Sequence, residues 1–445
     1  MTEREESAAS DDPRAPSDAA LEDRARDIVS HLATEEYDAV VSAFARDFRA
    51  SFAGLFPETF AAYLRLEPVP IVREHWRALT SLYGPFEEIV AMAVTSVGET
   101  KRVTATLGFR EGTQRLQLTF DRAGDVVGFE FPTAYEPPTY ADEIEFTELE
   151  MTVETEDLEL GGTLSFPMAS GSTPGVVLVH GAGPTDRDYT TGPNKFFTDL
   201  AWGLASNGIA VLRYDKRNAV ADLSPEEQTL ESVVVDDAVA AVDRLIDTDA
   251  VDSDRIFVVG HSVGGTCAPK VATEHGNVAG IVNLDGALAR SIATEVKHGI
   301  TEQWEQLDDS SEYADRQIAA VEAQVQRIEA REFDPDESLL GFPGAWWESA
   351  LEYDEERLDL LQDLSVPLFV ARTGRDLPET VAESFGHLSE LLTMDHSSLN
   401  FYTDLNHYFQ RGATPSSKLE AFTFRKPPAE TVVTDLATWI TETGG

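Results

Sequence analysis

From about residue 173 onward the sequence alternates short, almost wholly apolar runs with longer amphipathic segments. The apolar runs are GVVLVHG, IAVLRYD, RIFVVGHS, VAGIVNLD and VPLFVART, and segments with helical spacing separate most of them. Strands that are apolar on both sides must be covered on both faces, and intervening helices allow neighbouring strands to run parallel. We therefore expect an α/β fold with a mostly parallel, doubly wound sheet, which begins with a hairpin near residue 146.

The N-terminal part has a different organisation. Apolar residues recur at three- and four-residue spacing from about 21 to 66, which predicts helices, and at a spacing of two from 87 to 132, which predicts strands. These residues, 21–132, are expected to form a small α+β domain. The proline-containing segment 133–145 is expected to be a linker.

The first residues, 1–20, are acidic and polar, and they lack the basic start and apolar core of a signal peptide. We expect them to form a disordered leader of a cytoplasmic protein.

A charged helical segment interrupts the second domain at about 287–359, and it is too long for a simple connection. It carries four large aromatic residues, Trp304, Phe342, Trp346 and Trp347. We interpret it as a cap over the mouth of the sheet. The alternative is a surface insertion whose tryptophans pack on the body of the domain.

The net charge is strongly negative. The chain of 445 residues has 80 Asp and Glu against 34 Lys and Arg, a formal net charge of −46 spread along its length. Such a surface repels nucleic acid and anionic membranes, and no apolar run approaches the ~18 residues that span a bilayer. The carboxylate excess with few lysines resembles proteins of salt-loving organisms and predicts low stability in dilute buffer.

The one cysteine, Cys267, excludes an internal disulfide and a multi-thiolate metal site. Its position on the apolar side of a predicted helix indicates a buried packing residue.

A serine lies where a strand turns sharply into a helix. In RIFVVGHSVGGT, Ser262 is flanked by Gly260 and Gly264, and the glycines let the helix begin against the strand that it has just left. This strand–turn–helix pattern holds a serine exposed and nucleophilic, although a glycine-rich turn without chemistry is the alternative.

A nucleophilic serine needs a base and an orienting carboxylate. Of three downstream histidines, His387 falls in a predicted helix and His396 precedes the strand LNFYT. His407 follows that strand at the edge where ligands bind and is the expected base. For the acid we expect Asp376, after VPLFVART, with Asp285, after VAGIVNL, as the alternative.

An oxyanion hole needs two backbone N–H groups. Val263 supplies one from the start of the helix after Ser262, and the glycine-lined loop HGAGPTDRD supplies the other from Ala182. His180 at the start of this loop precedes the serine in the chain. It is expected to anchor the loop rather than to act as a base.

These segments, with GPNKFFTDLAWGLASNGIAVLRYDKR, SVPLFVARTGRD and LNHYF, resemble α/β-hydrolase fold enzymes of the dienelactone-hydrolase-like, esterase-type branch, over about 146–445. The resemblance implies Ser262, Asp376 and His407 as nucleophile, acid and base. The N-terminal domain is weakly similar to NTF2-like domains. Two departures concern the acid: Thr373 replaces a glycine in the acid loop, and Asp285 stands where relatives often have a small residue.

The expected function is hydrolysis of a small-molecule ester or related acyl bond through an acyl-enzyme, without metal or organic cofactor. Two alternative functions remain, one catalytic with the same triad and one non-catalytic. The triad could cleave peptides or transfer acyl groups to an acceptor other than water. The chain could also be a non-catalytic binding protein in which the N-terminal domain is the working part. The oligomeric state is left open.

Overall fold

The computed structural model describes residues 16–443 except for 57–64, 169–170, 250, 307–311, 376–385, 387, 389–396, 414–415 and 418. The chain forms two compact units, Met1–Thr133 and Ala134–Gly445. Most of the predicted leader, together with Asp376, His387 and His396, lies outside the described residues.

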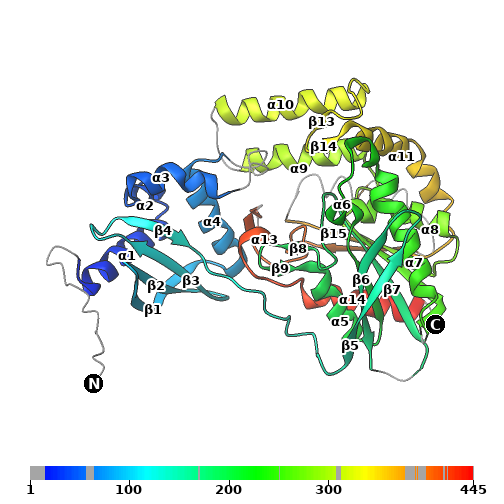
Figure 1. Ribbon diagram of the computed structural model, residues 1–445, viewed down its shortest axis with the longest axis horizontal. Helices are drawn as coiled ribbons and strands as arrows, with labels where there is room; N and C mark the ends of the chain where they lie inside the picture. Colours follow the sequence, from blue (N-terminus) through cyan, green and yellow to red (C-terminus); the bar gives the residue numbers. More distant parts are fainter. Residues whose placement is uncertain are drawn as a thin grey trace, which may run out of the picture. The chain divides into compact units, whose positions relative to one another are not determined.

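The first unit combines helices with a four-stranded antiparallel sheet of order β1-β2-β3-β4 (Figure 1). Its strands are β1 Phe86–Val97, β2 Thr100–Phe109, β3 Gly112–Phe120 and β4 Val126–Glu130. Its helices are α1 Asp18–Ala33, α2 Tyr37–Ser42, α3 Arg46–Ser51, the 3₁₀ turn η1 Phe52–Leu55 and α4 Pro68–Tyr83.

Two helix boundaries in this unit differ from the sequence expectation. Helix α1 begins at Asp18, inside the predicted leader, because the Ser17 hydroxyl accepts the N–H of Ala20 and caps the helix. Helix α4 lies beyond the predicted helical region and carries prolines in its first turn, where no N–H partner is lost. An NTF2-like assignment of this unit stays a prediction.

The second unit is built on an eight-stranded sheet of order β16-β15-β12-β11-β7-β10-β6-β5. Strands β5 and β6 form the predicted antiparallel hairpin, and β6 also pairs antiparallel with β10. All other neighbouring pairs of the sheet, from β10 to β16 in the order given above, are parallel. The strands are β5 Phe146–Glu154, β6 Glu159–Pro167, β7 Thr173–Val179, β10 Ala210–Tyr214, β11 Val251–His261, β12 Gly280–Leu284, β15 Leu368–Thr373 and β16 Ser397–Tyr402.

Helices cover both faces of this sheet (Figure 1). Helices α5 Phe196–Ser206 and α14 Glu430–Thr443 share a buried apolar cluster with side chains of the central strands. Helices α7 Asp236–Ile246 and α8 Val263–His275 pack together and against β7 and β11. The predicted α/β architecture with a doubly wound sheet is therefore confirmed.

Short elements complete the second unit. They are β8 Thr190–Thr191, β9 Asn194–Lys195, α6 Arg217–Val220, the 3₁₀ turn η3 Pro225–Glu227, the π-helical turn η4 Glu231–Val235 and α13 Leu419–Thr423.

The predicted insertion contains three helices: α9 Ile292–Gln306, α10 Glu312–Glu329 and α11 Gly344–Gln362, with the small hairpin β13 Ser338–Leu339 and β14 Phe342–Pro343 between the last two. Helix α11 packs against α8, and the hydroxyl of Tyr353 donates to the carbonyl of Thr266. Trp346 and Trp347 are buried against Phe342 within the insertion itself. The helical insertion is thus present.

Candidate active site

Ser262 occupies a strained turn between β11 and α8. Its backbone has φ 54° and ψ −122°, a conformation that L-residues rarely adopt, and it is the N-cap of α8. Strain of this kind persists only where the surroundings enforce it and is concentrated at functional sites.

The flanking glycines are required by close backbone packing. A Cβ atom at Gly260 would lie 2.2 Å from the carbonyl oxygen of Gly264, and one at Gly264 would lie 2.3 Å from that of Val179. Any side chain at either position would therefore push α8 away from β7 or β11. The two glycines that flank Ser262 at positions 260 and 264 are thus a geometric requirement of this turn, as predicted.

His407 is paired with Asp285. The Nδ1 atom of His407 lies 3.0 Å from Oδ2 of Asp285, and the side chains are 33% and 6% exposed, respectively. Asp285 follows β12, and His407 lies in the loop after β16, so the parallel sheet brings both to its carboxyl edge. The structure thus gives His407 the carboxylate that the sequence offered as the alternative. Asp376, the expected acid, lies outside the described residues.

The Asp285 carboxylate is held by two neighbours on β15. Thr373 donates to it through its hydroxyl, 2.5 Å from Oδ2, and through its N–H, 3.2 Å from Oδ1. Arg372 places Nε 3.5 Å from Oδ1. Burial alone would raise the pKa of Asp285, but the charge of Arg372 and the contact with His407 keep that pKa well below its ordinary value. The carboxylate is therefore ionised and can orient an imidazole.

A second histidine fastens the His407 loop to the nucleophile strand. His261, directly before Ser262, is fully buried, and its Nε2–H donates to the carbonyl of His407 at 2.8 Å. Its Nδ1, 3.3 Å from the hydroxyl of Tyr189, then accepts from that hydroxyl. The two histidine rings lie 4.7 Å apart between centroids. This contact holds the backbone of His407 against the residue that precedes the serine.

The glycine-lined loop after β7 lies against the serine. A Cβ atom at Gly181 would lie 3.0 Å from Cβ of Ser262 and 2.5 Å from the hydroxyl of Tyr189. Within the described part of the chain, the N–H groups of Ala182 and Val263 have no intramolecular acceptor. Both remain available to a ligand.

His180 anchors this loop, as the sequence predicted. Its Nε2–H donates to the carbonyl of Asp186 at 3.1 Å. Burial, reinforced by the charge of Lys216, lowers the pKa of His180 to about 3, so the ring is neutral at ordinary pH.

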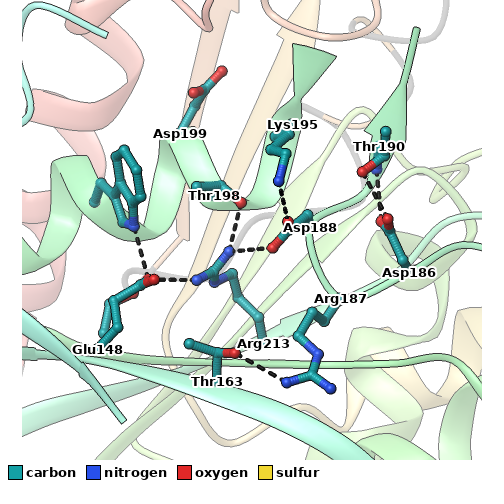
Figure 2. A network of polar contacts seen from close by, with 12 residues as sticks. Glu148, Thr163, Asp186, Arg187, Asp188, Thr190, Lys195, Thr198, Asp199 and Arg213 are labelled. Atoms are coloured by element: carbon teal, nitrogen blue, oxygen red, sulfur yellow. Dashed lines mark hydrogen bonds and ion pairs between the residues drawn. The ribbon is translucent and has the colours of Figure 1, made fainter. Parts of the chain in front are cut away.

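Polar contacts hold the far end of the loop (Figure 2). The guanidinium of Arg213 on β10 donates to Asp188 at 2.6 Å and to Thr198 at 2.5 Å, and it also contacts Glu148. Lys195 donates to the other oxygen of Asp188 at 2.7 Å. The loop is thereby attached to strands β5 and β10 and to helix α5.

Some supporting residues were not found from the sequence. They are Lys216, Arg372 and His261, which supports the site through its hydrogen bonds. Lys216 and Arg372 lie at or just after the carboxyl ends of β10 and β15. Charged residues that follow an apolar strand at the ligand-binding edge were the signal that could have identified them.

The remaining predictions concern the single cysteine, metal binding and membrane-spanning helices. Cys267 is buried in α8, and burial raises the pKa of its thiol, which fits a packing residue. In the described ranges no group of His, Cys, Asp and Glu could hold a metal ion. No described helix is long and apolar enough to cross a membrane.

A doubly wound sheet that carries a serine on a strand–turn–helix elbow and a histidine–carboxylate pair at the same edge defines the α/β-hydrolase class. The sequence comparison agrees. The chain belongs to the Alpha/beta hydrolase family, whose profile matches residues 176–428.

The chain is similar over nearly its whole length to the esterase EstD of Thermotoga maritima, with 30% identity over 421 residues and 93% of each chain covered. Among solved structures it matches an esterase of Pyrococcus furiosus at 16% identity, with a TM-score of 0.43 and coverage of 71% of this chain and 99% of the other. A dienelactone hydrolase of Anabaena variabilis matches at 17% identity and a TM-score of 0.40, with 67% and 98% covered. The prediction of a carboxylesterase-like α/β hydrolase is confirmed by the family membership and the similarity to EstD.

Proposed function

We propose that this protein hydrolyses carboxylic esters of small molecules through an acyl-enzyme, with Ser262 as nucleophile and His407 as base. The observation that carries the proposal is the contact between Nδ1 of His407 and the buried Asp285 carboxylate. The loop that contains His407 is hydrogen-bonded to His261, the residue before Ser262. A base oriented by a carboxylate, beside a strained serine, is the arrangement that activates a hydroxyl.

The reaction follows from the positions of these groups. Ser262 Oγ attacks the ester carbonyl while Nε2 of His407 accepts its proton. The N–H groups of Ala182 and Val263 stabilise the oxyanion, and the Asp285 carboxylate stabilises the imidazolium. His407 then returns the proton to the leaving alcohol. A water molecule, activated by the same imidazole, hydrolyses the acyl-enzyme and restores the serine.

We propose Asp285, rather than Asp376, as the acid of this triad. Nδ1 of an imidazole carries one hydrogen, and Asp285 accepts at hydrogen-bonding distance from it. Thr373 and Arg372 hold the carboxylate in place and charged. Asp376 follows Arg375 in the chain.

The test is reaction of the protein with a fluorophosphonate and with a short p-nitrophenyl ester. Wild type is expected to be labelled at Ser262 and to turn the ester over, whereas Ser262→Ala should fold and do neither. Ser51→Ala, an exposed serine of the first unit, is the matched control and should behave as wild type. Undiminished turnover by Ser262→Ala would exclude the proposal.

The choice among acyl-transfer reactions is made with the same protein. Esters of graded acyl length are expected to be hydrolysed, and peptides of the same acyl residues to be left intact. Release of free acid in the presence of alcohols or amines distinguishes hydrolysis from acyl transfer. Labelling by fluorophosphonate also excludes a non-catalytic binding protein.

We further propose that the acidic surface adapts the protein to high salt. The formal net charge of −46 makes the compact state self-repulsive, and salt screens this repulsion. The melting temperature is expected to rise steadily with KCl and much less with sucrose of equal osmolality. A melting temperature that is independent of KCl would exclude the adaptation.

A further inference from the structure

A buried lysine lies directly behind the loop that carries the candidate oxyanion donor. Lys216 follows β10 and is only 2% exposed. Its ammonium donates to the carbonyl of Gly181 at 2.7 Å and to that of Gly183 at 3.1 Å. Its backbone N–H donates to the carbonyl of Thr185 at 3.3 Å. All three acceptors belong to the segment 181–185.

The ammonium has no carboxylate partner within the described part of the chain. A buried charge without a counter-charge destabilises a fold, and an apolar side chain of the same length would avoid that penalty. The neighbouring cations behave differently: Arg187 pairs with Asp215, and Arg217 pairs with Asp237. The hydrogen bonds of the Lys216 ammonium are therefore made to the loop carbonyls.

One of these carbonyls belongs to the peptide group of the oxyanion donor. The carbonyl of Gly181 and the N–H of Ala182 are the two ends of a single planar amide. We propose that Lys216 is a positioning residue that fixes and polarises the Gly181–Ala182 peptide, so that the Ala182 N–H is a stronger donor to the oxyanion. This inference rests on the proposed function.

The physical effect follows from amide resonance. A cation at the carbonyl oxygen favours the resonance form with negative charge on oxygen and positive charge on nitrogen, which makes the N–H more acidic. In a buried site with low effective dielectric constant this polarisation is weakly screened. The benefit is larger for a developing oxyanion than for a neutral carbonyl, so it is expected in kcat more than in KM.

The charge of Lys216 also depends on pH. Burial lowers its pKa to about 8. The groups that face it are His180 after β7, Cys267 on α8 and Asp237 on α7. His180 has a pKa of about 3, burial raises the pKa of the Cys267 thiol far above 8, and Asp237 is paired with Arg217. We therefore expect an alkaline loss of activity near pH 8 that depends on Lys216.

The test compares Lys216→Met with wild type on a short p-nitrophenyl ester, with thermal unfolding as the check of folding. For the variant we expect kcat to fall about 10- to 100-fold, less than the ~10²–10³ of a deleted oxyanion donor, with KM changed by less than about 3-fold. The rate of labelling by fluorophosphonate should fall in parallel. The decrease of kcat around pH 8 should be present in wild type and absent in the variant.

The matched control is Lys195→Met. Lys195 also supports the loop, through Asp188 (Figure 2). No hydrogen bond joins its ammonium to a carbonyl of 181–185 among the described residues. It should lose less than about 3-fold in kcat and keep the alkaline decrease. An equal loss in both variants would reduce Lys216 to a structural anchor and overturn the proposal.

Two further outcomes separate this inference from the proposed function. If the wild-type enzyme is active and Lys216→Met has the same kcat, the inference is overturned and the proposed function is not. Ester turnover that survives Ser262→Ala overturns both. If Lys216→Met does not fold, the wild-type profile decides: constant kcat from pH 7 to 9.5, with the fold intact, would also overturn the inference.

Discussion

The Nδ1 atom of His407 lies 3.0 Å from the carboxylate of Asp285, a residue in the left-handed region at the end of β12 with φ 58°. The hydroxyl of Thr373 donates to the same oxygen. Since β12 and β15 are parallel neighbours with Leu284 opposite Ala371, Thr373 and Asp285 are brought to one point of the sheet edge. The imidazole of His407 is thus hydrogen-bonded to a carboxylate whose position is set by strands β12 and β15.

Replacement of that carboxylate should disable the base. We expect Asp285→Asn to lower kcat by about 10³–10⁴-fold, because the amide would stabilise the wrong tautomer of His407 and no longer stabilise the imidazolium. The ester should bind with nearly unchanged KM. Steady-state kinetics at neutral pH measure both constants.

The paired variant is Asp376→Asn. If Asp285 is the acid, this substitution should cost less than about 10-fold in kcat. A large loss in Asp376→Asn together with a small one in Asp285→Asn would restore Asp376 as the triad acid and contradict our assignment.

The choice of acid shows where sequence reasoning reaches its limit. Asp285 and Asp376 both follow apolar strands, and those strands are adjacent in the sheet. The sequence favoured Asp376 through its position after VPLFVART and through the family resemblance. The two departures from the family pattern, Asp285 and Thr373, are hydrogen-bonded to each other. Their coupling depends on strand register, which single positions in a sequence do not encode.

Local patterns performed better where the backbone itself sets the requirement. The serine elbow was predicted because only glycines fit against the neighbouring carbonyls. The strands of the first unit were predicted because their apolar residues recur at a spacing of two. Helix α4 was missed although prolines are compatible with the first turn of a helix. Lys216 was missed because its partners are backbone carbonyls on a loop distant in sequence, which carry no residue signature.

Substitution of Gly264 tests the geometry of the elbow. Its added Cβ would lie 2.3 Å from a backbone oxygen, so Gly264→Ala should destabilise the second unit by several kcal/mol and abolish activity. Gly299, inside α9, has open space around it, and Gly299→Ala should be neutral or stabilise by up to about 1 kcal/mol. Chemical unfolding and ester turnover of both variants check this, and a fully active Gly264→Ala would contradict the structure.

The contact between His261 and His407 makes a separate prediction. His261→Phe keeps a ring in the aromatic cluster but removes the donor to the carbonyl of His407, so the base should lose its fixed position. We expect kcat to fall about 10- to 100-fold, the cost of a misplaced catalytic group. Tyr189→Phe removes only the hydroxyl at the other ring nitrogen and should cost less. Equal kcat in His261→Phe and wild type would show that the tether is not needed.

The first unit should lose stability in mild acid through His75. This ring is buried in contact with the rings of Phe56 and Phe131, and its Nδ1–H donates to the carbonyl of Ile71. Burial lowers its pKa from 6.5 to about 4, so between these values the unfolded chain binds a proton that the folded chain does not. Stability must therefore fall as pH decreases from 6.5 to 4, by about 2–3 kcal/mol in total.

Hydrogen exchange of the α4 amides in the full-length protein measures this free energy at pH 7 and 4.5. His75→Phe should remove about 2–3 kcal/mol of the difference between the two pH values, whatever its effect on packing, because a packing change is independent of pH. His31→Gln, a surface histidine on α1, is the control and should keep the wild-type difference. An unchanged pH dependence in His75→Phe would show that this ring is not the group that takes up the proton on unfolding.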